Sequence, residues 1–487
     1  MSNAPMVARR WFRRMAGIAC TIALGLPLAS CSLYHEAYRE GANAELHAPD
    51  THGYDLRFIE ADDQGWFWDP AQATDALSFV RQQAAARDTV VLLFVHGWHH
   101  STCCCDENLE GFKEVLQRLH DELEQPMYRQ ARNRAGTRAG SQPINVIGIY
   151  VGWRGRSLPG LLDYATFWGR KSAARRVGET DFQEFMIRLQ QLYDGRSRGD
   201  PFLGLVSVGH SFGGEVLLTA TSKFFESELQ HANPAPALLR AASAPNAPVP
   251  VDKALRGFGD MVILVNPAVE AAAYERVNLL ARGLRYPKEQ TPLLVTFSAD
   301  NDGPRHALFE WGRIVGSWFT SAPTLADPRE RALQREALGV YGGNGEQVTH
   351  RLAPVDGSAL LEKSTRASTP EALCAQDGGQ CRYDWYRWRD PQPPAAVDSL
   401  DANDESGQQL PSILGFDFSQ ELVFSKLRFG PSSAQAMPYQ PMIVASVDRN
   451  VIDGHNGMFS EPFMDFLIRY IGFVEAKRYL LEAGAAS

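Results

Sequence analysis

Short runs of consecutive apolar residues recur along this 487-residue chain, and segments with helical periodicity separate them. A strand that is apolar at every position is typical of a sheet buried on both faces, because a half-exposed strand alternates. The helical connections predict an α/β protein with a mostly parallel central sheet and helices on both of its faces. The runs span residues 90–95, 144–151, 202–208, 261–265 and 293–297, and a sixth run spans 442–447.

Local signals predict elements at both ends of this array. Residues 58–61 and 66–68, separated by Asp-Asp-Gln-Gly, predict an early hairpin. Asp69, followed by a proline, predicts a helix through about Arg87, because Asp caps helices and Pro is tolerated in the first turn. A closing helix is expected from about residue 460.

Residues 303–440 separate the fifth run from the sixth and are rich in Pro, Gly and Asp. Loops of this length in compact domains are usually functional or irregular. We interpret this interval as an insertion before the last strand, acting as a lid over the site or as simple decoration. The core would then comprise residues 56–302 and 441–487.

The N-terminal residues predict export. Four arginines precede an apolar stretch that is too short to span a bilayer comfortably. Leu28-Ala29-Ser30-Cys31 resembles the bacterial lipobox, which implies a signal peptide at 1–30, acylation of Cys31 and a tether over 31–55. Ser32 after the cysteine implies the outer membrane. The alternative is an ordinary signal peptide with an incidental cysteine.

Net charge limits the partners. The formal charge is −9, and loss of the four signal-peptide arginines lowers it to −13. An acidic exported body argues against nucleic acid as a partner. Membrane contact is therefore expected through the anchor at Cys31, and a small-molecule ester or lipid is the expected substrate.

Five cysteines remain after the signal and the anchor. Cys374 and Cys381 bracket a flexible turn, so an oxidising compartment predicts a local disulfide between them. The triplet at residues 103–105 predicts at least one free thiol, because consecutive cysteines do not easily bond each other.

The same triplet follows three histidines, and this combination of residues suggests a metal site. His96, His99 and His100 precede the cysteines, but the spacing matches no standard zinc motif. We expect no metal. We expect instead that Asp106 caps the next helix and that the cysteines lie at the rim of a site, where a redox-sensitive thiol is a hypothesis.

The most specific motif is Gly209-His210-Ser211-Phe212-Gly213, directly behind an apolar run and before a helical segment. A strand that enters Gly-x-Ser-x-Gly predicts a nucleophile turn, in which small flanking residues leave the serine exposed above the sheet. Ser211 is the candidate nucleophile, and Gly209 and Gly213 are the small residues that the turn requires.

A nucleophilic serine needs a base, an acid and oxyanion donors. His455 is the candidate base, because it follows the last strand at the sheet edge where ligands gather. Asp302 is the candidate acid and Asp300 the alternate, since both follow the fifth run. The other histidines nearby in sequence are poorer bases, because two belong to other motifs and His306 is too close to the acid.

The oxyanion donors are expected from two backbone N–H groups. Phe212 begins the helix after the serine, and Trp98 follows His96-Gly97 at the end of the first run. A glycine at position 97 lets the backbone approach a substrate oxygen. A plain strand-to-loop turn is the alternative reading.

Taken together, these features resemble the α/β-hydrolase superfamily across about residues 56–302 and 441–487. Within it, the chain resembles a group of bacterial serine hydrolases in the segments 94–100, 152–155, 166–171, 209–214 and 266–268. The resemblance implies lipase- or esterase-like chemistry through an acyl-enzyme, without a cofactor. Some lipases carry the acid where this chain has Asn266, which cannot serve; Glu270 is an outside candidate. The other function class is a lipid-anchored scaffold that keeps the fold without turnover.

One basic, aromatic stretch remains open. Residues 166–176 predict a helix that either lines an acyl or anionic pocket or packs its aromatic residues on the sheet and solvates its charges.

Overall fold

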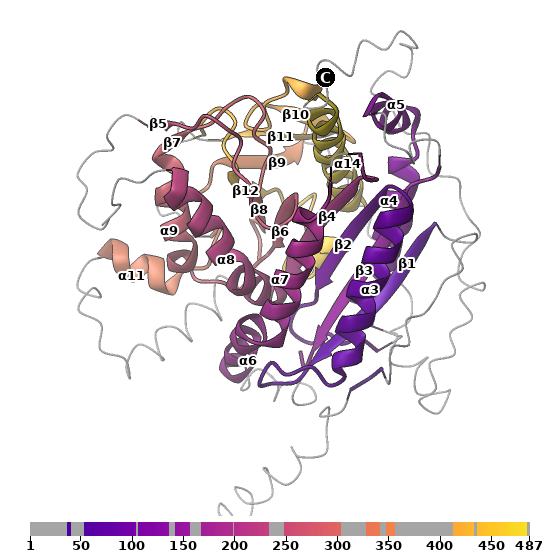
Figure 1. Ribbon diagram of the computed structural model, residues 1–487. Coiled ribbons are helices and arrows are strands. Elements are labelled where there is room, and N and C mark those ends of the chain that lie inside the picture. Colours follow the sequence, from indigo (N-terminus) through magenta and orange to yellow (C-terminus); the bar gives the residue numbers. More distant parts are fainter. Residues whose placement is uncertain are drawn as a thin grey trace, which may run out of the picture.

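The computed structural model describes residues 37–39, 53–103, 106–135, 142–155, 167–197, 199–232, 248–302, 328–340, 347–355, 413–432 and 436–484. Within these ranges ten strands form one sheet in the order β1-β3-β2-β4-β6-β8-β12-β9-β11-β10 (Figure 1). All neighbours from β1 to β9 pair in parallel, and β11 and β10 continue the sheet in antiparallel pairing. The protein is therefore α/β, with a large and mostly parallel sheet.

The strands of the sheet are β1 (Tyr54–Ala61), β2 (Thr89–Val95), β3 (Asn145–Trp153), β4 (Leu203–His210), β6 (Met261–Val265), β8 (Leu294–Ala299), β9 (His350–Pro354), β10 (Leu422–Phe424), β11 (Leu427–Pro431) and β12 (Met442–Val447). The short strands β5 (Val249–Pro250) and β7 (Leu284–Arg285) pair separately. The helices are α3 (Pro70–Ala86), α4 (Glu107–Leu123), α5 (Pro126–Ala135), α6 (Phe167–Glu179), α7 (Asp181–Asp194), α8 (Phe212–Ala232), α9 (Ala271–Arg282), α11 (Pro328–Arg335) and α14 (Glu461–Gly484).

All six apolar runs form strands of this sheet, and β6 and β12 have the predicted bounds. The cap predictions are also confirmed. The side chain of Asp69 accepts a hydrogen bond from the Ala71 N–H at the start of α3, and Asp106 accepts one from Asn108 at the start of α4.

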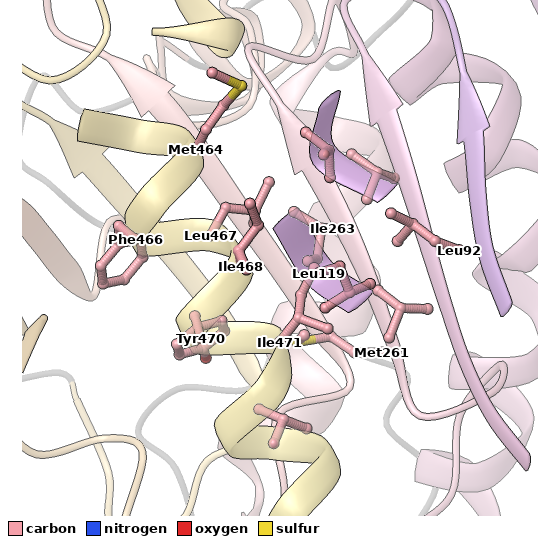
Figure 2. Packing of buried hydrophobic residues seen from close by; sticks show 14 of the residues in the cluster. Leu92, Leu119, Met261, Ile263, Met464, Phe466, Leu467, Ile468, Tyr470 and Ile471 are labelled. Carbon is pink, nitrogen blue, oxygen red and sulfur yellow. The ribbon is translucent and has the colours of Figure 1, made fainter. Parts of the chain in front are cut away.

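Two apolar clusters lie on opposite faces of the sheet. Alternate residues of β2 divide between them: Leu92 and Phe94 belong to one cluster and Leu93 to the other. Helices α4 and α14 cover the first face, and α3, α7 and α8 cover the second. Figure 2 shows α14 alongside the strands of this face, and side chains of the first cluster come from both, among them Ile471 of α14 and Met261 of β6. Burial on both faces explains why these strands lack alternation.

The predicted early hairpin is reduced to one bridge. Ala61 pairs with Phe67 in antiparallel fashion, but β1 itself is longer than expected and pairs in parallel with β3 at the edge of the sheet. The core therefore begins at Tyr54.

The interval 303–440 is not wholly an excursion from the sheet. Its described parts include β9, β10 and β11, which the sequence reading missed, and α11, which packs on α9. The signal peptide, Cys31, Cys374 and Cys381 lie outside the described residues. Within the described ranges, no helix is long and apolar enough to cross a membrane.

Candidate active site

Ser211 stands between β4 and α8 on a strained turn, residues 209–214, named here the serine turn. The φ of Ser211 is +55°, a left-handed conformation that non-glycine residues rarely adopt. Its N–H donates to Val265 O and its carbonyl accepts from Ala268 N–H, each at 3.0 Å. These contacts with the end of β6 hold the strained residue in place.

Close backbone contacts explain the glycines of the turn. A Cβ on Gly209 would lie 2.6 Å from Gly213 O, and a Cβ on Gly213 would lie 2.1 Å from Val95 O. Backbone atoms cannot move aside as a flexible side chain can, so only glycine fits. Gly97 meets the same turn from β2, because a Cβ there would lie 2.8 Å from Ser211 Cβ.

Three side chains that are far apart in sequence form one hydrogen-bonded chain. His455 Nε2 lies 2.7 Å from Ser211 Oγ, and His455 Nδ1 lies 2.8 Å from Asp302 Oδ2. The Asp302 carboxylate can only accept, so Nδ1 carries the proton and Nε2 is left to accept from the serine hydroxyl. Asp302 is 0% exposed, Ser211 3%, and the His455 side chain 17%.

The alternate acid points elsewhere. The carboxylate of Asp300 lies 3.2 Å from the Arg351 guanidinium, which also binds Asp448 at 3.0 Å. Partial burial raises the pKa of Asp300, although Arg351 opposes this effect. Glu270, the outside candidate, pairs with Lys171 at 3.0 Å. Of the carboxylates proposed from the sequence, Asp302 is the one that binds His455.

His455 lies in the loop between β12 and α14, residues 448–460, named here the histidine loop. Its main-chain carbonyl accepts hydrogen bonds from Asn266 Nδ2 and from His210 Nε2, both at 2.9 Å. The Asn266 side chain also accepts from Ala299 N–H at 2.8 Å, at the end of β8. Asn266 thus occupies the position that could have held an acid, and it ties the histidine loop to the sheet.

The other two histidines near the serine are fixed in neutral forms. His96 Nδ1 donates to Gly97 O, and its Nε2 accepts from Trp153 N–H, so both ring nitrogens are engaged. Burial lowers the pKa of His96 to about 4 and that of His210 to about 3. Neither ring is available as a base, in agreement with the sequence reading.

The two expected oxyanion donors flank the serine. Phe212 is the first residue of α8, where backbone N–H groups have no partner within the helix. Trp98 follows Gly97, where an added Cβ would lie 2.8 Å from Ser211 Cβ. A carbonyl oxygen next to Ser211 would therefore meet the positive end of the α8 dipole.

An aromatic wall lies beside the serine turn. The ring of Phe167, on α6, lies 5.3 Å from that of Trp98 and 4.9 Å from that of Phe212. These ring contacts join α6 to the residue after Ser211 and to the residue after Gly97, and Ser211 itself is buried.

The basic helix α6 matches neither of its two sequence readings fully. Phe167 packs at the serine turn, but two of the charges are buried. Lys171 donates to Ala268 O at 2.9 Å and pairs with Glu270 and with Glu215 of α8. This cluster supports the segment that binds the Ser211 carbonyl. The sequence contained no signal for it beyond the run of basic residues.

Within the described part of the chain, no group of three or more His, Cys, Asp or Glu side chains is arranged to hold a metal ion. His100 binds Asp106 at 3.0 Å, and the carbonyl of Cys103 accepts from Asp106 N–H. Cys104 and Cys105 lie outside the described residues.

No family model and no curated protein matches this chain. A crystal structure of an uncharacterized protein from Pseudomonas aeruginosa is similar at 10% sequence identity and a TM-score of 0.16, over 51% of this chain and 42% of that chain. The chain thus covers less than half of that protein's length, and so slight a likeness carries no argument about fold or activity.

Proposed function

We propose that this protein is a serine hydrolase of carboxylic esters, with an α/β-hydrolase fold and lipase- or esterase-like chemistry. The proposal rests chiefly on the hydrogen-bonded chain from Ser211 through His455 to Asp302. A scaffold without turnover has no physical need for a strained serine aligned with a histidine and a buried carboxylate.

In the proposed reaction, Ser211 Oγ attacks the ester carbonyl while His455 Nε2 takes its proton. The carboxylate of Asp302 stabilises the imidazolium that forms. The Phe212 and Trp98 N–H groups stabilise the oxyanion, an interaction typically worth about 3 kcal/mol per donor. His455 then protonates the departing alcohol, leaving an acyl-enzyme on Ser211. A water molecule, deprotonated by the same histidine, releases the acid.

Labelling with a fluorophosphonate tests this proposal. The parent protein should label and should hydrolyse a short-chain p-nitrophenyl ester, whereas Ser211→Ala and His455→Ala should do neither while keeping the same unfolding midpoint. Ser207→Ala removes a buried hydroxyl on β4 that plays no part in the reaction, and it should label like the parent. Folded parent protein that neither labels nor turns over an ester would favour the scaffold.

We also propose that Cys31 is acylated and anchors the exported protein to the bacterial envelope, on the outer membrane. Incorporation of a fatty-acid analogue that is lost in Cys31→Ser would support this anchor.

A further inference from the structure

The exposed aromatic residues of the described surface gather at one corner. The large apolar side chains that are at least one third exposed include three aromatic ones: Tyr38 at 42%, Trp66 at 60% and Trp68 at 46%. The others are single aliphatic residues on separate elements, namely Ile187, Val249, Leu279 and Val423. Scattered aliphatic residues need no explanation, but a cluster of exposed tryptophans does.

A rigid turn after β1 presents the two tryptophans. Trp66 N–H donates to the carboxylate of Asp62 at 2.9 Å, and Trp68 N–H donates to Glu60 O at 2.9 Å. Between them, Phe67 turns inward and its N–H donates to Asp181. Gly65 makes the turn possible at φ +91°, since a Cβ there would lie 1.8 Å from Thr180 Oγ1. The backbone that presents the two indole rings is therefore already ordered, so their insertion into a membrane would cost little further conformational entropy.

The N-terminal segment is fastened to the same place. The carboxylate of Glu60 accepts hydrogen bonds from the N–H groups of Tyr38, at 3.1 Å, and Arg39, at 2.8 Å. Arg39 Nε donates to Thr102 O at 3.0 Å, and its guanidinium lies 4.1 Å from the ring centroid of Phe58. Glu60 thus connects Tyr38 to Trp68, because its carboxylate accepts from the Tyr38 N–H and its main-chain carbonyl accepts from the Trp68 N–H.

This corner lies on the edge of the sheet that carries Ser211. Trp66 follows the carboxyl end of β1, and Ser211 follows the carboxyl end of β4, three positions along the sheet. At about 4.8 Å per strand, that separation is roughly 14 Å. Cys31 precedes Tyr38 by seven positions, so the chain between them reaches at most about 25 Å.

The charged side chains around the corner do not favour anionic lipid, because the carboxylates of Asp62 and Asp69 lie beside the tryptophans and accept hydrogen bonds from backbone N–H groups. Both carboxylate oxygens of Asp63 bind the Arg170 guanidinium, at 2.6 and 2.8 Å. Such a surface offers aromatic rings without an excess of positive charge to attract anionic lipid. Trp and Tyr side chains favour the boundary between lipid and water, since each ring combines an apolar body with a polar group.

We propose that Tyr38, Trp66 and Trp68 form a membrane-binding surface for zwitterionic lipid, and that it seats the Ser211 edge of the sheet against the headgroups. The inference rests on the proposed anchor at Cys31 for its orientation, but the surface binds lipid without the acyl chain.

Vesicle binding by the mature chain from residue 31, carrying Cys31→Ser, tests this surface. We expect it to float with dioleoylphosphatidylcholine vesicles, and brominated acyl chains should quench part of its tryptophan fluorescence. Trp66→Ala with Trp68→Ala should bind about 50-fold more weakly, the loss expected when roughly 100 Å² of apolar surface no longer enters lipid. The control is Val423→Ser, on β10, the outermost strand at the other end of the sheet from β1. Val423 is as exposed as Trp68, and this variant should bind like its parent.

Absence of binding by the parent, or equal binding by the double variant, would overturn the proposal. Ester hydrolysis in solution should be unchanged in the double variant, which separates this surface from the chemistry at Ser211. The vesicle experiment measures lipid binding by a protein that has no acyl anchor and carries out no reaction. Its outcome therefore does not depend on whether the proposed ester hydrolysis or the proposed acylation of Cys31 is correct.

Discussion

Two hydrogen bonds, from Ser211 and from His210 to His455, join the serine turn and the histidine loop, yet the two segments are held in different ways. Backbone contacts closer than a Cβ would allow hold the serine turn, at Gly209 and Gly213. Side-chain hydrogen bonds hold the histidine loop, chiefly those that Asn266 and His210 donate to the carbonyl of His455. A glycine with backbone atoms this close tolerates no added side-chain atom. A loop held by several hydrogen bonds can lose one of them and keep the others. The two halves of the site should therefore fail differently.

Loss of the acid should have the largest effect on activity. Asp302→Asn keeps the shape of the side chain but supplies an N–H donor that favours the wrong tautomer of His455. We expect kcat for a short-chain ester to fall about 10³- to 10⁴-fold. Asp300→Asn, on the neighbouring carboxylate that binds Arg351, should stay within about twofold of the parent. The reverse result would move the acid to Asp300.

Adding one methyl group to the serine turn should destabilise the whole protein. In Gly213→Ala the new Cβ would clash with Val95 O and His96 O. We expect the free energy of unfolding in urea to fall by about 3 kcal/mol or more, as for severe overpacking. The matched control is Gly169→Ala on α6, where nothing lies within 4 Å. It should gain up to about 1 kcal/mol from helix propensity. Equal stability of the two variants would contradict the steric account.

The smallest effect concerns pH and the histidine loop. The pKa of His210 is about 3 in the folded protein, against about 6.5 when unfolded. Below pH 6.5 the unfolded chain binds the extra proton, so this stability is complete above pH 6.5 and declines as the pH falls toward 3. His210→Gln should therefore reduce the slope of unfolding free energy between pH 6 and 4 by about 1.4 kcal/mol per pH unit.

His231→Gln, at an exposed histidine of α8, is the control for that slope and should leave it unchanged. An unaltered slope in His210→Gln would mean that the buried ring is not the group that titrates.

What the sequence could predict follows the same division. The serine turn is local, so its glycines, strand and helix stand within a few residues and their pattern is readable. The sequence left both Asp302 and Asp300 as candidate acids, because both carboxylates follow β8 within three residues. Asn266 could be excluded as an acid from the sequence. Its hydrogen bond to the carbonyl of His455, 189 residues later, could not be predicted, because no local pattern marks it.

The strands that the sequence reading missed share a physical reason. β10 alternates buried and exposed residues over three positions, and β11 does so over only the first three of its five, which is too short for a clear period. β9 contains the buried polar residue His350 in place of an apolar run. Strands at this end of the sheet are buried on one face only, so they need not be apolar at every position as the central strands are.

The order of the strands also has a consequence for biosynthesis. β12 is made after β9, β10 and β11, but it lies between β8 and β9 in the sheet. A nascent chain that has not yet reached residue 442 exposes an unpaired edge on each side of the gap, and such edges favour aggregation. β12 thus joins the two parts of the sheet, and the histidine loop follows it, so Ser211 can meet His455 only after every other described strand of the sheet has been made.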